Sequence, residues 1–345
     1  MTSAGRSLAV IGGTGFFGKS VLDAFRRGLL APWGIGRVIA VARHPEKLAR
    51  DHPDLMGEGV ELVALDIAAE GAVLPRADYV IHAANTTDAR AYAADPARER
   101  AAILAAAERF VARAAIDCPD ARIVYTSSGA VYGQQPADVA GLDEDAPFTA
   151  AQGMVEYKRD YAEAKRSAEQ MIAAYGRSHG ARVTVARCFA FIGTYLPRDQ
   201  HFAVGNFLAD GIAGRPVRIN ARHPVIRSYM HADDLVRWLM TIAHAASPDC
   251  PVYNVGSDQG VDVADLAARV AARYGVSVDL PERTDMPVDR YVPSIGRAAR
   301  ELGLVLDLDL DGALDAVVAQ VSGNALVHAD DSATSHDRSA ATSFQ

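Results

Sequence analysis

Short apolar segments alternate with longer helical patterns along the first half of the chain. The pattern predicts strands at Leu8–Ile11, Val38–Val41, Val60–Ala64, Tyr79–His82, Arg122–Thr126 and Val183–Arg187. It predicts helices between several of them, at Gly15–Arg27, Pro96–Ile116 and Glu156–Tyr175. Strands that are apolar at nearly every residue are buried on both faces, and helices between them are typical crossovers of a parallel sheet. The pattern therefore indicates an α/β fold with a doubly wound parallel sheet.

The pattern of apolar and polar residues changes after residue 187, where the predicted segments become shorter and are interrupted by prolines. Helices are again predicted at Ala232–Ala246 and Val263–Tyr274, with a strand at Val252–Val255 between them. We expect a large lobe over residues 7–187, to which 223–256 return, and a smaller C-terminal lobe from 188–222 and 257–325. Residues 328–345 are rich in Ser, Ala, Asp and Thr without periodicity, and we expect a disordered tail.

Composition and charge narrow the classes of partner. The chain has 345 residues, with 35 Lys and Arg against 43 Asp and Glu, and a formal net charge of −8. A net-negative surface disfavours coating of nucleic acid or anionic lipid, because both are polyanions. The 3 cysteines are too few and too scattered for a disulfide framework or a metal site, so we expect reduced thiols and no metal.

No apolar run reaches the length of about 18 residues that marks a membrane-spanning helix. The N-terminal apolar stretch runs into a glycine turn with no cleavage site after it. We therefore expect a cytoplasmic protein without a membrane or nucleic-acid partner.

That glycine-rich turn joins the first predicted strand to the first predicted helix. Residues 12–18 read Gly-Gly-Thr-Gly-Phe-Phe-Gly and satisfy both Gly-x-Gly-x-x-Gly and Gly-x-x-Gly-x-x-Gly. Glycine permits the tight turn, lets a pyrophosphate approach the backbone and lets the helix pack closely. The helix N-terminus offers free N–H groups to phosphate. We interpret Gly12, Gly15, Phe16, Phe17 and Gly18 as the dinucleotide-binding turn of a Rossmann-type fold, with a purely structural turn as the alternative.

The end of the second predicted strand bears on the choice between NAD and NADP. An NAD-selective site usually places Asp or Glu there, to bind the ribose 2′-hydroxyl. Here Ala42 and Arg43 follow the strand, and a guanidinium suits a 2′-phosphate. The sequence favours NADP, with NAD as the alternative and a solvated surface arginine as the simpler interpretation of Arg43. Asp66 and Ile67 follow the third strand and would suit the adenine, or form an ordinary polar strand end.

A tyrosine and a lysine lie four residues apart in the helix predicted over Glu156–Tyr175. Tyr161 and Lys165 therefore share one helix face. A free tyrosine has a pKa of about 10, and a nearby ammonium should lower that pKa toward the range of a proton-transfer group. Ser128 ends the fifth strand, at the sheet edge where α/β folds bind ligands. We predict that Ser128 positions a substrate oxygen for Tyr161; aromatic packing beside a surface lysine is the alternative for the pair.

In this order, these residues resemble an extended short-chain dehydrogenase/reductase of the NAD-dependent epimerase/dehydratase group, whose members mostly act on nucleotide-diphosphate sugars. The similarity spans most of residues 7–325. Its motifs are the glycine turn, Asp66-Ile67, Ile81-His82-Ala83-Ala84, Ser127-Ser128 with Val131-Tyr132-Gly133, Tyr161-x-x-x-Lys165, Arg187, and Arg227 through Leu235.

The resemblance implies a Rossmann lobe, a C-terminal sugar-nucleotide lobe, frequent homodimers and hydride exchange with a nicotinamide. It gives Ser128, Tyr161 and Lys165 the catalytic positions, with Tyr161 and Lys165 also at the cofactor. It implies that Ala83 and Ala84 line the cofactor site.

The resemblance also implies how the substrate is held. Asn206 and Arg227 match positions that bind the nucleotide diphosphate, and Ser128 is the third expected substrate-binding residue. A guanidinium binds phosphate in bidentate fashion, which suits Arg227 to this role. A structural ion pair of Arg227 with Asp233 or Asp234 is the alternative.

One departure concerns the reaction. The 4,6-dehydratases carry an Asp-Glu pair directly after the catalytic hydroxyl, whereas Gly129 and Ala130 follow Ser128 here. We therefore expect an oxidoreductase of a nucleotide-diphosphate sugar, either a 4-ketoreductase or a 4-epimerase, and Arg43 favours the NADPH-consuming reductase. A dehydratase, a non-sugar carbonyl reductase and a non-catalytic dinucleotide-sensing regulator are less favoured, the last because Ser128, Tyr161 and Lys165 are all present.

Overall fold

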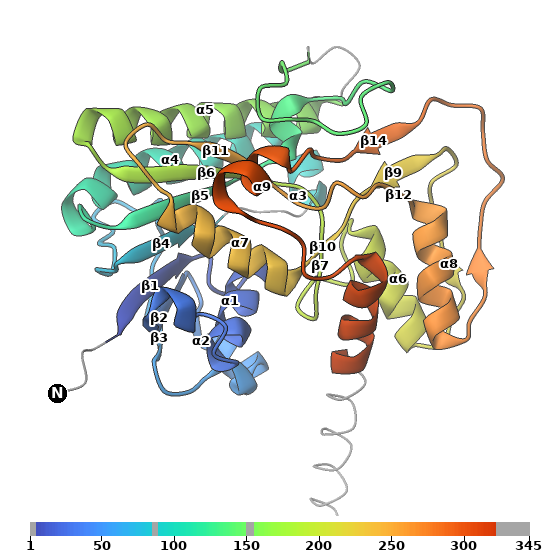
Figure 1. Cartoon of the computed structure of the whole chain (residues 1–345), viewed down its shortest axis with the longest axis horizontal. Helices are drawn as coiled ribbons and strands as arrows, with labels where there is room; N and C mark the ends of the chain where they lie inside the picture. The colour runs from blue at the N-terminus through green and yellow to red at the C-terminus, as the bar shows by residue number, and fades with distance from the viewer. Residues whose placement is uncertain (1–4, 85–88, 150–154, 322–345) are drawn as a thin grey trace, which may run out of the picture.

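The computed structural model describes residues 5–84, 89–149 and 155–321 (Figure 1). The strands are β1 (Arg6–Ile11), β2 (Ile35–Ala42), β3 (Val60–Ala64), β4 (Tyr79–His82), β5 (Arg122–Ser128), β6 (Arg182–Cys188), β7 (Phe191–Ile192), β8 (Val217–Arg218), β9 (Val225–Arg227), β10 (Met230–His231), β11 (Val252–Val255), β12 (Val261–Asp262), β13 (Val278–Asp279) and β14 (Asp289–Tyr291). The α-helices are α1 (Phe16–Arg26), α2 (Glu46–Asp51), α3 (Ala89–Ala94), α4 (Pro96–Asp117), α5 (Glu156–His179), α6 (Ala203–Ile212), α7 (Ala232–His244), α8 (Val263–Tyr274) and α9 (Gly296–Leu302). Short 3₁₀ turns are η1 (Ala31–Trp33), η2 (Pro53–Leu55) and η3 (Gly129–Tyr132).

Seven parallel strands form the central sheet, in the order β11-β6-β5-β4-β1-β2-β3. Leu8 of β1 pairs with Val38 of β2 on one side and with Tyr79 of β4 on the other. One face packs on α1, α7 and α9, and the other on α4 and α5 (Figure 1). Because both faces are covered, the strands need apolar residues at nearly every position, and the seven strands predicted from that pattern are the seven of this sheet. The predicted α/β doubly wound fold is confirmed.

The winding order sets the position of the site. From β1 the chain runs outward through β2 and β3 on one side, and through β4, β5 and β6 on the other. The carboxyl ends of β1 and β4 therefore flank the crevice where such sheets bind ligands.

A second hydrophobic core lies to one side of the sheet (Figure 1). Helices α6 and α8 and the helical residues 310–321 build it, with the short sheets β8-β13 and β12-β9-β14 beside them. The division differs from the expected one near residues 295–306, because Ala298 and Leu304 are buried in the first core instead. Residues 328–345, expected to be a disordered tail, lie outside the described residues. Within the described part of the chain, no helix is both long and apolar enough to cross a membrane.

Candidate functional site

The glycine turn lies at the carboxyl end of β1, against two other strand ends. The backbone N–H groups of Gly12 and Gly13 donate to the Val41 carbonyl at 2.9 and 3.0 Å. Gly12 has a φ of 97°, and a Cβ there would lie 2.7 Å from the Ala83 carbonyl oxygen and 2.9 Å from the Ala84 nitrogen. The turn is thus fixed by the ends of β2 and β4, and Ala83 and Ala84 lie directly against it.

The glycines of the turn serve different purposes. A Cβ on Gly18 would lie 2.3 Å from the Gly13 carbonyl oxygen, so close packing of α1 requires glycine there. A Cβ on Gly15 would meet only the Gly12 carbonyl oxygen, at 3.3 Å, and Gly15 has an ordinary φ of −80°. The fold requires glycine less strictly at position 15 than at position 18, whereas a pyrophosphate that approaches the backbone at the N-terminus of α1 favours glycine there. The turn therefore fits a dinucleotide.

We expect Gly15→Ala to fold almost normally and to bind cofactor about 10- to 100-fold more weakly, because its methyl group blocks one or two charge-assisted hydrogen bonds from backbone to phosphate. Thermal unfolding and titration of cofactor fluorescence measure the two effects separately. Gly18→Ala is the contrasting variant, because its methyl group would clash with the Gly13 carbonyl and should lower the free energy of unfolding. Unchanged cofactor affinity in Gly15→Ala would contradict a phosphate site at this turn.

Phe16 and Phe17 form the first turn of α1, and their rings belong to the core. The two rings pack edge to face with centroids 5.8 Å apart, and Phe17 packs on Phe191 at 5.3 Å. What these two residues can offer a phosphate is their backbone N–H groups, while the rings hold the helix against the sheet.

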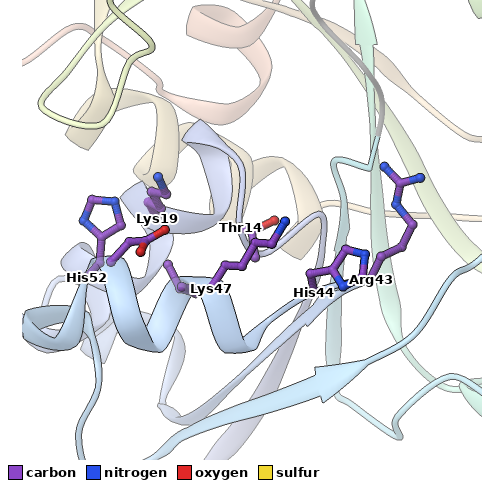
Figure 2. A pocket seen from close by; sticks show the side chains of 8 residues that line it. Thr14, Lys19, Arg43, His44, Lys47 and His52 are labelled. Carbon is purple, nitrogen blue, oxygen red and sulfur yellow. The ribbon is translucent and has the colours of Figure 1, made fainter.

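A basic pocket of about 330 Å³ opens beside the glycine turn (Figure 2). Its walls come from the turn and α1, the end of β2, and α2; the lining residues are Thr14, Lys19, Arg43, His44, Lys47, Leu48, Asp51 and His52. Lys19, Arg43 and Lys47 outnumber the single carboxylate of Asp51, so the pocket favours an anion. Arg43, which the sequence favours for a ribose-phosphate contact, is exposed and lines this pocket. Lys47 was not predicted from the sequence as a phosphate-binding residue, although its position four residues after Arg43 could have indicated that role.

The adenine-side candidates lie at the end of β3. Asp66 is exposed, and its carboxylate accepts a hydrogen bond from the Ala68 N–H at 3.0 Å, which caps a turn. Ile67 is buried in the sheet core. Both lie at the ligand-binding edge, and only the Asp66 side chain faces solvent.

Ser128 and the Lys165 ammonium both lie at the carboxyl end of β5. Ser128 is the last residue of the strand, and its Oγ accepts a hydrogen bond from the Ala130 N–H at 3.1 Å. The Lys165 side chain is buried, and its ammonium donates to the Thr126 carbonyl at 2.9 Å. It lies 5.0 Å from the centre of the Tyr125 ring. Burial lowers the pKa of Lys165 to about 8, because the interior disfavours the charged form.

Tyr161 lies one helical turn before Lys165, with its hydroxyl close enough to Ser128 for the serine to influence its pKa. Its ring packs edge to face on Tyr92 with centroids 5.0 Å apart. Burial raises the pKa of Tyr161 to about 12, and the neighbouring Ser128 offsets only part of that rise. The expectation that Lys165 lowers this pKa was wrong, because burial of the hydroxyl dominates and the ammonium bonds to the Thr126 carbonyl instead. At neutral pH the tyrosine therefore holds its proton.

The predicted substrate residues lie apart from this pair, in and beside the second core. The Asn206 side chain donates to the Gln200 carbonyl at 2.8 Å, near the start of α6. Arg227 ends β9, and its guanidinium pairs with the Asp289 carboxylate at 2.7 Å. The expected alternative partners of Arg227 were wrong, because Asp233 pairs with Arg27 and Asp234 with Arg237.

A buried ion pair fixes the segment that follows Ser128. Arg187 pairs with Glu169 at 2.8 Å and donates to the Tyr132 hydroxyl and the Glu144 carbonyl. This network ties β6, α5 and the turn after β5 together, so it holds the residues around Ser128 in place.

Sequence reasoning missed strand β14. Its first residue, Asp289, pairs with Arg227, and its last, Tyr291, places a hydroxyl 3.4 Å from Ser128 Oγ. The chain separation from Ser128 is 163 residues, and a strand of three residues leaves no periodic signal.

A Rossmann-type sheet with a dinucleotide turn and a pair of hydroxyls at one edge is the arrangement of a nicotinamide-dependent enzyme. The chain belongs to the NAD dependent epimerase/dehydratase family, whose model matches residues 8–256. It is 26% identical over 185 residues to UDP-glucuronic acid decarboxylase 5 of Arabidopsis thaliana, which covers 53% of this chain and 52% of the relative. The chain thus spans about half the length of the first curated relatives that it matches.

Solved structures show the same fold over nearly the whole chain. UDP-glucose 4-epimerase from Thermotoga maritima, determined with UDP-glucose, has a TM-score of 0.75 at 20% identity, over 92% of this chain and 99% of that chain. The Bordetella bronchiseptica enzyme WbmF, determined with NAD+ and UDP, has a TM-score of 0.73 at 20% identity, over 98% of both chains. At this level of identity the likeness establishes the fold.

Proposed function

We propose that this protein is an NAD(P)-dependent oxidoreductase that reduces the 4-keto group of a nucleotide-diphosphate sugar. The observation that carries the proposal is the placement of the Tyr161 hydroxyl beside Ser128, one helical turn from the buried ammonium of Lys165. Reduction of a ketone needs an acid that gives its proton to the developing alkoxide, and Tyr161 has that proton at neutral pH. Ser128 would donate a hydrogen bond to the same oxygen, and Lys165 supplies a buried positive charge one helical turn away.

The cofactor assignment rests on the turn and on the basic pocket. Gly15 and the N-terminus of α1 would hold the pyrophosphate, with Ala83, Ala84 and Asp66 along the rest of the edge. When bound, the dinucleotide supplies the hydride. The cationic lining of the pocket supports NADP over NAD, because a 2′-phosphate would neutralise charges that a bare ribose leaves unpaired.

The substrate assignment rests on Arg227 and Asn206. A guanidinium that now pairs with Asp289 can turn to a diphosphate, which carries more negative charge and more acceptor oxygens. The structural neighbours named above were determined with UDP-glucose or UDP, which are nucleotide diphosphates. This chemistry supports a nucleotide-diphosphate sugar rather than a small neutral carbonyl compound.

A 4-epimerase is the second candidate, and it needs the same residues in both directions. It begins by removing a proton from a sugar hydroxyl, for which Tyr161 must first be a phenolate. Burial raises the pKa of Tyr161, which favours the proton-donating direction of a reductase over this first step.

The space next to Ser128 argues against a dehydratase. A side chain at position 129 would place its Cβ 2.6 to 2.7 Å from three ring atoms of Phe189. That ring is held by Tyr291, with centroids 4.6 Å apart, and by Tyr132 at 6.3 Å. An acid at this position, such as the dehydratases carry, therefore has no room.

We expect Gly129→Ala to lower the free energy of unfolding by about 1–3 kcal/mol, because the added methyl group overpacks the site against Phe189. Chemical denaturation of the two proteins measures the loss. Gly57→Ala is a matched control, since a Cβ there meets nothing within 4 Å. Trimming the ring with Phe189→Leu in the Gly129→Ala protein should recover part of the loss; if it recovers none, the ring is not the obstacle.

The proposed reaction is tested by incubating the protein with NADPH and a panel of nucleotide sugars and their 4-keto forms. A reductase consumes NADPH in proportion to product, which absorbance and product analysis together reveal. Product without loss of NADPH would establish the epimerase instead. Turnover of non-sugar carbonyl compounds alone would refute both.

The homodimer and the cytoplasmic location stay predictions. Light scattering of the purified protein tests the first, with a dimer expected at about twice the chain mass of 36.6 kDa.

A further inference from the structure

Strand β14 brings a third hydroxyl to the catalytic pair, one that the reaction described above does not use. The Tyr291 hydroxyl lies 3.4 Å from Ser128 Oγ and 3.5 Å from the Cys188 carbonyl oxygen. Its ring packs on Phe189, with centroids 4.6 Å apart, which fixes the direction of the hydroxyl. The Cys188 carbonyl can only accept, so the single Tyr291 proton serves both oxygen atoms as a bifurcated hydrogen bond, which the two similar distances allow.

The hydrogen-bonding capacity of Ser128 shows what this contact can do. A serine hydroxyl has one proton to donate and two lone pairs that accept. The Ala130 N–H occupies one lone pair at 3.1 Å. If Tyr291 donates to the other, both lone pairs are filled and the serine proton must point elsewhere. The remaining hydroxyl beside Ser128 is that of Tyr161, which lies close enough for Ser128 to influence its pKa.

We propose that Tyr291 is a positioning residue, which donates to Ser128 and thereby aims the Ser128 proton at the reacting oxygen beside Tyr161. The inference rests on the proposed roles of Ser128 and Tyr161. Without the Tyr291 contact, the Ser128 hydroxyl proton can take several orientations, and only one of them points at the substrate. Tyr291 removes the others before the substrate arrives, which is the preorganisation that makes a donor effective in a transition state.

The same short strand also reaches the proposed phosphate residue. Asp289, two residues before Tyr291, pairs with Arg227 at 2.7 Å, and β14 pairs with β9 along its length. The Arg227 guanidinium lies 6.0 Å from the centre of the Tyr291 ring. Tyr291 therefore stands between the group proposed to hold the diphosphate and the group proposed to hold the reacting oxygen.

The kinetic test is a double-mutant cycle of Tyr291→Phe and Ser128→Ala. Tyr291→Phe keeps the ring and removes only the hydroxyl, so kcat should fall about 3- to 10-fold with little change in KM, as for one lost hydrogen bond. In the Ser128→Ala background the same change should have no further effect, because Tyr291 acts through Ser128. An equal loss of kcat in both backgrounds would show that Tyr291 does not act through the serine. Tyr253→Phe is the matched control, since its hydroxyl bonds to Glu301.

A second measurement does not depend on knowing the substrate. The NMR shift of the ¹³Cζ carbon of Tyr161 reports hydrogen bonds to its oxygen, and Tyr161→Phe assigns the signal. Tyr291→Phe should move this signal in the same direction as Ser128→Ala does, and should not move it in the Ser128→Ala protein. If no nucleotide sugar is turned over, the proposed reaction fails while this signal still decides the role of Tyr291. An unmoved signal in Tyr291→Phe overturns the inference.

Discussion

Tyr161→Phe is expected to lower turnover about 10²- to 10⁴-fold, the usual contribution of a positioned general acid. The variant keeps the ring and its packing on Tyr92, so it should fold normally. It loses the only atom through which Tyr161 can give a proton to the sugar oxygen. Cofactor affinity should stay nearly unchanged, because the pyrophosphate and the basic pocket are bound by other elements. Single-turnover rates with NADPH and a fluorescence titration of the cofactor measure the two quantities.

The control for this variant is Tyr175→Phe, on the same helix. Tyr175 lies 14 residues further along α5, about 21 Å at 1.5 Å per residue, and should not affect turnover. Normal turnover in Tyr161→Phe would remove the proposed acid. Loss of cofactor binding together with turnover would instead show that the hydroxyl serves the cofactor.

Arg43→Ala is expected to weaken NADP binding about 10- to 100-fold, since a charge-assisted hydrogen bond to phosphate is worth about 1.5–3 kcal/mol. Affinity for NAD should change little, because NAD has no 2′-phosphate for the guanidinium to contact. Lys47→Ala should act in the same direction, since Lys47 lines the same pocket. Calorimetric titration with both cofactors gives the ratio of the two affinities.

Arg37→Ala is the matched control for charge. Arg37 belongs to β2, the strand that leads to Arg43, but it is exposed, pairs with Glu61 and does not line the pocket. It should leave both affinities nearly unchanged. Equal loss of NADP and NAD binding in Arg43→Ala would contradict a 2′-phosphate site and favour NAD as the cofactor.

Several features of the fold and the candidate site could be predicted from short stretches of sequence, because they depend on hydrophobic periodicity or on residues with special backbone properties. Uniformly apolar strands identify a sheet buried on both faces, and a glycine turn at a strand end predicts a phosphate site. Ser128 at the end of β5 could be placed in the same way, because carboxyl ends of parallel strands share one edge.

Other features depend on groups that are distant in the chain. The pKa of Tyr161 is raised because the folded protein buries the hydroxyl, and the spacing between Tyr161 and Lys165 in the sequence does not reveal that burial. The partner of Arg227 is Asp289, 62 residues away, although two closer aspartates were available in sequence. Neither result has a local signature.

The sequence by itself determined the doubly wound parallel sheet and singled out Ser128, Tyr161 and Lys165 as candidates, because these follow from short-range periodicity and ordered motifs. The tertiary structure alone decided which glycine is left for a ligand, why position 129 excludes a side chain, and that Tyr291 reaches Ser128. The physical reason is that steric fit and hydrogen-bond geometry are properties of atoms brought together in space. Residues 163 positions apart in the chain become neighbours only when the second core has folded against the sheet.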